Sequence, residues 1–181
     1  LDVGVTLHAA TARIDTRDGR AHGVTLGDGT TLCAGTVVLA AGAWSAQLDE
    51  VAVRPVKGQT LRLRLPGGMR LARIVRAVVK GNQVYVVPRS DGRVLVGASS
   101  EEAGFDVSPR AGAVYELLRD AQSVLPELSE AVLDEVSTGL RPGSPDNAPV
   151  IGPSAIERLV SATGHSRNGI LLTPVTADAV A

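Results

Sequence analysis

The sequence predicts a mixed α/β and α+β fold, in which an inserted antiparallel sheet interrupts a domain of strands and helices. Residues 36–41 (TVVLAA) form a continuous apolar run, which is typical of a strand buried on both faces of a parallel sheet. Four segments within residues 54–98 instead alternate apolar and polar positions, as antiparallel strands with one buried face do. Residues 158–181 then return to a buried strand followed by a helix.

The first 35 residues predict a small β meander. Two turn segments that contain Asp and Gly, Arg17–Arg20 and Gly27–Gly29, divide its strands. The apolar run that follows stops at Gly42, and residues 43–48 predict a short helical turn after it. The expected strands of the meander are Val5–Ile14, Ala21–Leu26 and Thr30–Cys33.

The central part predicts an antiparallel sheet with one helix. Asp91-Gly92 is a tight turn, which makes the last two strands a hairpin. Ser108 is the expected N-cap of the helix, with Pro109 at its first position and its end near Val124. The expected strands are Arg54–Leu65, Arg73–Val79, Gln83–Val87 and Arg93–Ala98. The expected apolar face of the helix is Val114, Leu117, Leu118, Ala121 and Val124.

The last part predicts a return to strand and helix. Val132–Leu140 is an expected strand, and Arg158–Ala162 is a second one that is buried. Between them, Arg141–Pro153 (RPGSPDNAPVIGP) is so rich in Pro and Gly that a structured loop is expected instead of a helix or a central strand. A final helix is expected over Asn168–Ala181.

Composition limits the classes of function. The chain has 181 residues and a formal net charge of -1, so there is no electrostatic case for binding nucleic acid or an acidic membrane surface. No apolar run approaches the roughly 20 residues of a membrane-spanning helix. Cys33 is the only cysteine, so no intrachain disulfide is possible and the redox compartment stays open. A reducing, cytoplasmic setting is the default expectation. The chain begins with Leu and ends inside an expected helix, so both ends are expected to be cut from a longer protein.

Glycine-containing segments follow the two buried strands. Thr36–Ser45 (TVVLAAGAWS) ends its strand at Ala-Ala-Gly, where a ligand or another backbone can approach closely. The alternative is a strand that only needs a small residue for its turn. Ser161–Leu172 (SATGHSRNGILL) ends its strand at Gly164 and starts a helix near Asn168, and a helix N-terminus suits negative charge. The alternative there is an ordinary connection, with Ser166 or Asn168 as a cap.

Arg141 and Tyr85 are candidate binding residues. Arg141 lies in a stiff Gly- and Pro-rich stretch, where a guanidinium can bind a planar carboxylate through two hydrogen bonds. The alternative is a surface arginine paired with Asp146 or Glu135. Tyr85 lies in the middle of the hairpin, and its phenol could pack in the core, as single tyrosines usually do, or donate a hydrogen bond to a substrate.

The order and separation of these segments resemble a known family. GLRPGSPDNAPVIG (139–152) and GHSRNGILL (164–172) are the most specific pieces, and RPVKGQ (54–59) and YVVPR (85–89) support them. Nearly the whole chain resembles the D-amino-acid oxidase superfamily of FAD-dependent enzymes, and within it the glycine oxidases of thiamine biosynthesis.

The resemblance implies part of a glutathione-reductase-like FAD domain with an inserted antiparallel-sheet substrate domain. Residues 1–51 would be the second part of the FAD-binding domain, residues 52–144 the substrate-binding domain, and residues 145–181 the return to the FAD-binding domain. The GxGxxG motif that holds a dinucleotide pyrophosphate does not occur after any expected strand. The chain alone is therefore expected to hold little FAD and to be inactive.

The resemblance also implies the residues of the site. Tyr85, Arg141 and Arg167 would bind the substrate, the first two through its carboxylate. No side chain is expected to act as a catalytic acid or base, because positioning against the flavin suffices. The three scattered histidines predict no metal site. Noncovalent FAD would lie against Ala41, Gly42, Trp44, Gly164, Arg167, Asn168, Gly169 and Ile170.

The implied reaction is the dehydrogenation of a small amino acid, glycine first among them, with oxygen as the second substrate. Its products would be hydrogen peroxide and an imine, which hydrolyses to a keto acid and ammonia. Lys80 and Gln83 depart from the glycine oxidase pattern near the mouth of the substrate pocket. The alternatives are an oxidase or dehydrogenase of sarcosine, a D-amino acid or proline, and a flavin-free binding module. A homo-oligomer is left open.

Overall fold

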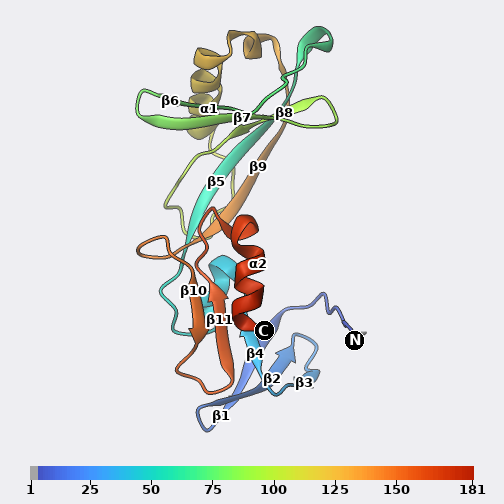
Figure 1. The fold of residues 1–181 in the computed structure, drawn as a ribbon, viewed down its shortest axis with the longest axis vertical. Helices are drawn as coiled ribbons and strands as arrows, with labels where there is room; N and C mark the ends of the chain where they lie inside the picture. The colour runs from blue at the N-terminus through green and yellow to red at the C-terminus, as the bar shows by residue number, and fades with distance from the viewer. Residues whose placement is uncertain (1–3) are drawn as a thin grey trace. The chain divides into compact units, whose positions relative to one another are not determined.

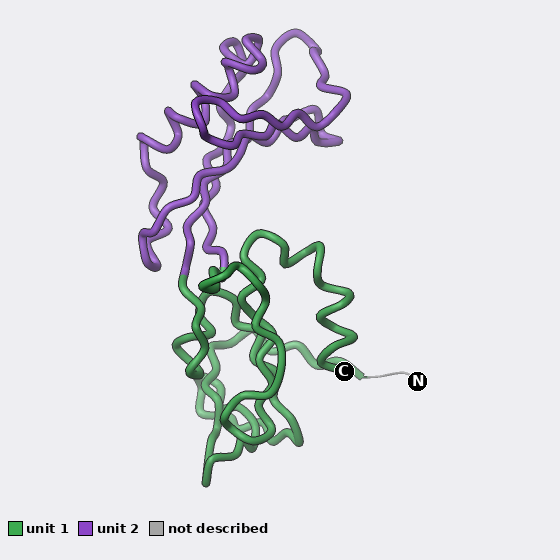
Figure 2. The backbone as a smooth tube through the Cα atoms, turned by 60° about the vertical axis from the view of Figure 1, so that its left-hand side comes forward, with its two compact units in different colours: residues 1–54, 142–181 green, residues 55–141 purple. Residues whose placement is uncertain are grey.

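The structure is a computed structural model that describes residues 4–181, which form two compact units (Figure 2). The first unit combines the chain up to Arg54 with Pro142–Ala181, and the second is Pro55–Arg141. The structure combines helices with several β-sheets, so the predicted mixed α/β class is confirmed. The expected boundaries after residues 51 and 144 lie near these limits. Their assignment to a cofactor domain and a substrate domain stays a prediction.

An antiparallel meander opens the first unit, with β1 (Ala12–Arg17), β2 (Arg20–Leu26) and β3 (Thr31–Cys33) side by side in that order (Figure 1). The turn between β1 and β2 consists of residues 18 and 19, whose φ angles of 50° and 73° are the left-handed values that a tight hairpin turn requires. The prediction that the first strand starts at Val5 is wrong. Val5 is 87% exposed and pairs with no strand of the described chain, so it lacks the neighbour that would make it part of a sheet.

The second sheet of this unit is mixed. β11 (Leu159–Thr163) pairs antiparallel with β10 (Val150–Pro153) and parallel with β4 (Val37–Leu39). A 3₁₀ turn, η1 (Gly42–Gln47), follows β4, and the helix α2 (Gly169–Val180) follows β11 (Figure 1). The carboxyl ends of the two parallel strands, β4 and β11, therefore lie at the same end of the sheet.

A small core holds the mixed sheet to the meander. Leu39 of β4 and Leu159 of β11 are buried against Ala21 of β2. The backbone continues this contact, since the Ala21 N–H donates to the Glu157 carbonyl at 2.8 Å. The prediction that β4 is buried on both faces is wrong, because Val38 is 45% exposed: the described part of this unit leaves one face of the strand open.

The prediction of a loop over Arg141–Pro153 is wrong at both ends of that range. β9 (Val132–Gly143) continues through Arg141 and Pro142, and β10 begins at Val150. Pro153 is tolerated because β10 is the edge strand of its sheet, where one side of the backbone needs no partner. Arg141 thus belongs to a strand, and a strand fixes the direction of its side chain more firmly than a loop does.

The second unit is one five-stranded sheet with a helix. Its strands lie in the order β6-β7-β8-β5-β9, and every pair with a described register among them is antiparallel. The sheet members besides β9 are β5 (Arg54–Arg64), β6 (Val75–Val79), β7 (Asn82–Pro88) and β8 (Arg93–Gly97). The helical elements are η2 (Pro66–Gly68), α1 (Ala111–Val124) and η3 (Pro126–Glu130).

One face of this sheet carries the core of the unit. The buried side chains alternate along the strands, as in Leu61 and Leu63 of β5 or Val84 and Val86 of β7, and α1 packs on them. The predicted apolar face of α1 is confirmed, since all five of its residues belong to this core. The strand residues between the buried ones point to the opposite face, which α1 does not cover.

The start of α1 differs from the prediction. The N-cap is Arg110 and not Ser108, and no side chain of the cap residue bonds to the helix. The reason is that Ser108 is engaged elsewhere: its N–H donates to Asp106 Oδ1 at 2.8 Å, and its carbonyl accepts from Lys57 Nζ at 3.1 Å. The Arg110 N–H instead donates to Gln59 Oε1 at 3.0 Å, so a side chain of β5 supplies the acceptor.

Candidate functional site

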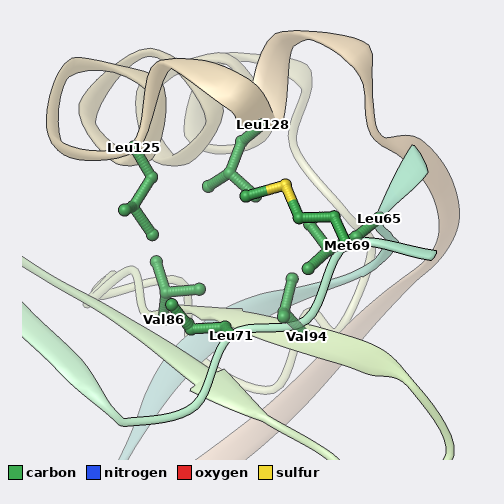
Figure 3. A pocket seen from close by; sticks show the side chains of 7 residues that line it. All are labelled: Leu65, Met69, Leu71, Val86, Val94, Leu125 and Leu128. Carbon is green, nitrogen blue, oxygen red and sulfur yellow. The ribbon is translucent and has the colours of Figure 1, made fainter. Parts of the chain in front are cut away.

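A pocket beside the core of the second unit does not suit an amino acid. Leu125 and Leu128 face Val86 and Val94 across it, with the Met69 side chain reaching toward Leu128 (Figure 3). All seven lining side chains are apolar, and the pocket has room for about one water. Residues 4–181 also contain no cluster of acidic, His or Cys side chains that could hold a metal ion. In that same range no helix has the length and apolar character needed to cross a membrane.

Tyr85 lies on the sheet face that α1 leaves open. Its neighbours Val84 and Val86 are in the core, whereas Tyr85 is half-buried and its register partner is Gly97 of β8. A Cβ at position 97 would lie closer than 3.0 Å to the phenol, so glycine alone leaves room for it. Within residues 4–181 the Tyr85 hydroxyl makes no hydrogen bond, which leaves its O–H available as a donor.

Arg141 is held by backbone and not by an acid. Its Nη1 donates to the Ser99 carbonyl at 3.1 Å and, more weakly, to the Lys57 carbonyl at 3.5 Å. The pairing with Glu135 considered from the sequence does not form, because Glu135 accepts from Arg62. Among the described residues Arg141 has no ion pair, and its Nη2 and Nε have no hydrogen bond. This free edge of a fixed guanidinium is suited to a carboxylate.

The Asp146 alternative for Arg141 is not seen either. Asp146 Oδ1 accepts from the Ala148 N–H at 2.9 Å and from the Ser144 hydroxyl at 3.5 Å, within its own turn. An Asp side chain that bonds to the backbone two residues later is an ordinary turn feature. The half-buried charge of Arg141 therefore lacks an acidic partner in the described chain.

Two glycines place Arg141 and Tyr85 on the same face of the sheet. Gly58 lies under the Arg141 guanidinium as Gly97 lies under the phenol of Tyr85. Gly97 pairs with Thr60, and Gly58 is two residues before Thr60, so both glycines face the same side. The Arg141 guanidinium and the Tyr85 hydroxyl are therefore two hydrogen-bond donors on the same face of this sheet.

A buried polar network beside Arg141 was missed from the sequence. Lys57 and Gln59 are fully buried on β5, opposite in direction to Gly58. Lys57 Nζ pairs with Glu101 Oε2 at 3.1 Å, and Gln59 Nε2 donates to Glu101 Oε1 at 2.7 Å. The motif RPVKGQ was the available signal, since a lysine inside an otherwise buried strand needs a counterion. The identity of that counterion, 44 positions away, could not be inferred from spacing.

Three candidate cofactor residues of the first unit lie at the carboxyl end of its two parallel strands. Ala41 and Gly42 follow β4, and Gly164 follows β11, its parallel neighbour. A buried pair joins the two segments: Thr163 Oγ1 donates to the Gly42 carbonyl at 3.1 Å and accepts from the Ser45 hydroxyl at 2.9 Å. The carboxyl ends of parallel strands are where α/β folds bind ligands. The φ angle of 55° at Gly42 favours glycine at this turn.

The remaining candidates surround the start of η1 and of α2. Trp44, on η1, is 48% exposed, and the backbone N–H of Trp44 donates to the Ala41 carbonyl at 3.1 Å. Arg167 and Asn168 are exposed in the loop before α2, and Gly169 and Ile170 begin the helix. The capping expected as the ordinary alternative is absent, since neither Ser166 nor Asn168 bonds through its side chain to the described helix start. The N–H groups of the first turn thus remain available to an electronegative ligand.

Comparison with known proteins defines the class. Residues 1–181 match the family described as FAD dependent oxidoreductase, and the chain belongs to that family. It is 42% identical over 164 residues to glycine oxidase of Pseudomonas putida, which covers 87% of this chain and 43% of that protein. It is also 39% identical over 174 residues to the bifunctional protein ThiO/ThiG of Synechocystis sp., covering 96% of this chain and 26% of that protein.

The solved structures agree with the sequence relatives. The glycine oxidase from Bacillus cereus matches with a TM-score of 0.80 and 30% identity, over 92% of this chain and 46% of that one. The fold of this chain is therefore similar to that of a glycine oxidase over most of its length. The chain spans less than half the length of each of these relatives.

Proposed function

We propose that this chain is part of a FAD-dependent oxidase of a small amino acid, with glycine as the first candidate substrate. The observation that carries the proposal is the Arg141 guanidinium, which among residues 4–181 has no acidic partner and has a free edge on the same sheet face as the Tyr85 hydroxyl. The names of the relatives, glycine oxidases among them, favour an amino acid as the source of the carboxylate.

Two residues of the second unit, Arg141 and Tyr85, hold the substrate. Arg141 binds the carboxylate through Nη2 and Nε, and Tyr85 donates its O–H to the same group. Binding at one end of a short molecule fixes the position of its α-carbon, which is the contribution that positioning makes to catalysis. No side chain is required to remove a proton from carbon, and no catalytic acid or base is assigned.

The residues of the first unit fit the electron-rich edge of a flavin. Ala41, Gly42 and Gly164 present backbone without bulky side chains, and the α2 start offers uncapped N–H groups. Such a helix end stabilises negative charge. We assign Trp44, Arg167, Asn168, Gly169 and Ile170 to the same cofactor surface, with FAD held noncovalently. When bound, FAD supplies the hydride acceptor for the oxidation.

The products would be hydrogen peroxide from oxygen, and a keto acid and ammonia from the imine. A cytoplasmic setting is part of the proposal, because a chain with one cysteine forms no intrachain disulfide and needs no oxidising compartment. The runner-up substrates are sarcosine, a D-amino acid and proline, since all of them offer the carboxylate that Arg141 would bind. A flavin-free binding module is the alternative outside the enzyme class.

The test is peroxide release by the flavoprotein that carries this chain at the full length of its relatives. Glycine, sarcosine, D-alanine and D-proline are compared at equal flavin concentration. Glyoxylate and ammonia from glycine support the proposal, and a larger kcat/KM with another of the four shifts the substrate. Flavin-free protein, or no peroxide from any of them, contradicts it.

A further inference from the structure

The ladder between β5 and the chain after β8 contains one extra residue. The last regular pair is Thr60 with Gly97, and the next bridge is Lys57 with Glu101. Three steps along β5 therefore face four steps along the other side, which is the count of a β-bulge. A bulge disrupts the pairing locally and can redirect groups that a regular ladder would use.

The redirected group is the Ser99 carbonyl. Ser99 N–H donates to the Gln59 carbonyl at 3.2 Å, as in an antiparallel pair, but Gln59 N–H donates to the Ser99 hydroxyl at 2.8 Å. The hydroxyl takes the place that the Ser99 carbonyl would have in a regular ladder. The carbonyl is thereby left to accept from Arg141 Nη1 at 3.1 Å.

Side chains lock this arrangement from the buried side. The Ser99 hydroxyl donates to Glu101 Oε1 at 2.6 Å, and Gln59 Nε2 donates to the same oxygen at 2.7 Å. Lys57 Nζ holds the other carboxylate oxygen at 3.1 Å, and the Lys57 and Glu101 backbones exchange two hydrogen bonds of 2.9 Å. Both carbonyls that contact Arg141 thus belong to residues of one network.

The charges in the network are balanced. Lys57 is fully buried, and Glu101 is 24% exposed. Burial acts to raise the pKa of Glu101, but hydrogen bonds from Ser99, Gln59 and Lys57 outweigh it and lower that pKa from its ordinary value. A buried network in which every member is satisfied is rigid, which is the property that holding a guanidinium requires.

We infer that Ser99, Gln59, Glu101 and Lys57 are positioning residues that orient Arg141 for the substrate carboxylate. They fix the Ser99 and Lys57 carbonyls, which occupy Nη1 and leave Nη2 and Nε for the ligand. This inference rests on the proposed function of Arg141. It adds that the affinity for the carboxylate depends on residues that do not touch the substrate.

The central variant is Ser99→Ala, with Ser99→Thr as its conservative rescue. Alanine removes the hydroxyl that frees the carbonyl, whereas threonine keeps it. In the full-length flavoprotein, Ser99→Ala is expected to raise the KM of the best amino-acid substrate and the Ki of acetate by about three- to tenfold, the effect of one hydrogen bond. The kcat and the flavin content stay unchanged, and Ser99→Thr restores both affinities.

Asp120→Asn is the matched control. Asp120 is a buried carboxylate of the same unit, bonded to Arg119 Nε at 2.8 Å and Asn82 Nδ2 at 3.4 Å, without contact to the network. It is expected to lower the melting temperature and leave KM and the Ki of acetate as they were. If Ser99→Ala does not fold, the double variant Lys57→Met, Glu101→Gln, which removes the ion pair without leaving a buried charge, takes its place.

The outcomes distinguish a failure of the positioning network from a failure of the proposed carboxylate binding by Arg141. If Arg141→Lys weakens acetate binding and Ser99→Ala leaves it unchanged, the network is only structural and the inference is wrong. An equal rise in KM with Asp120→Asn also overturns it, because general loosening would then explain both. If Arg141→Lys itself has no effect, the carboxylate assignment of the proposed function has failed instead.

Discussion

The guanidinium of Arg141 lies over Gly58, so close that a Cβ at position 58 would come nearer than 3.0 Å to Cζ, Nη1 and Nη2 of that side chain. A glycine in the interior of a strand is otherwise unfavourable, and it is found where another group approaches the backbone closely. The glycine of RPVKGQ is therefore explained by the arginine that it accommodates.

Gly58→Ala is expected to displace the Arg141 side chain. Since the obstacle is a guanidinium held by two carbonyls, the variant should lose about 1–3 kcal/mol of unfolding free energy, the scale of overpacking. It should also raise the KM for the amino acid, because the displaced group no longer presents its free edge. The measurements are denaturant unfolding and steady-state kinetics.

Gly112→Ala is the control for that substitution. Gly112 lies in the first turn of α1, and no described residue outside this helix comes within 4 Å of its Cβ position, so alanine is expected to add up to about 0.5–1 kcal/mol of stability through helix propensity. Its KM should equal that of the parent. A Gly58→Ala protein with the parent's stability and KM would show that Arg141 can move aside without consequence.

Arg141→Lys is expected to weaken substrate binding while the flavin content stays the same. Lysine keeps the charge but has no second N–H edge for a bidentate contact. The loss of a charge-assisted hydrogen bond corresponds to roughly 1.5–3 kcal/mol, or about 10- to 100-fold in KM. Kinetics and the flavin absorbance of the same preparations give both quantities, and unaltered kinetics would mean that Arg141 is structural.

Tyr85→Phe isolates the hydroxyl from the ring. The ring still covers Gly97, so folding is expected to be unaffected. Affinity for the amino acid should fall by about 0.5–1.5 kcal/mol, the usual contribution of one hydrogen bond. The Ki of acetate should rise in parallel, because the proposed contact is to the carboxylate. A change in kcat alone would place the hydroxyl near the reacting amine instead.

Asp106 is expected to stabilise the start of α1 in a pH-dependent manner. Hydrogen bonds from the Ser108 backbone and side chain, and then from Arg110, hold the pKa of Asp106 well below its ordinary value. A carboxylate with a lowered folded pKa contributes stability above its unfolded pKa of about 3.9. That contribution is lost as the pH falls toward the folded value.

The melting temperatures of Asp106→Asn and the parent should therefore differ most at neutral pH. The gap should narrow as the pH is lowered from 7 to 3. Glu130→Gln is the control, since Glu130 is exposed and has no hydrogen bond or ion pair within the described chain. A gap for Asp106→Asn that is independent of pH would show that the carboxylate charge is not what stabilises the helix start.

Much of the second unit could be predicted because its strands have one buried face. Alternation in β5, β7 and β8 gave boundaries within two residues of those observed, and the apolar spacing of α1 identified its packed face. The boundaries around Arg141 could not be predicted in the same way. Pro and Gly suggested a loop, yet β9, which pairs with β5, continues through Pro142 to Gly143.

The candidate residues Arg141 and Tyr85 could be identified from the sequence, but the residues that hold Arg141 in place could not. Arg141 stood out as a cation in a stiff segment, and Tyr85 as one of few aromatic residues. Ser99, Glu101 and the bulge that joins them to β5 depend on pairing between segments about 40 residues apart. Local periodicity contains no information on such a contact.

Trp44 is the only tryptophan in the chain, and it stands half-exposed on η1, next to the Gly42 turn. Its fluorescence therefore reports from one known place and can be excited apart from the tyrosines. A flavin bound at that edge would quench the emission by energy transfer, so cofactor binding can be titrated optically without any turnover. Cys33, the only cysteine and exposed on β3, offers a single attachment point for a dye in the same unit.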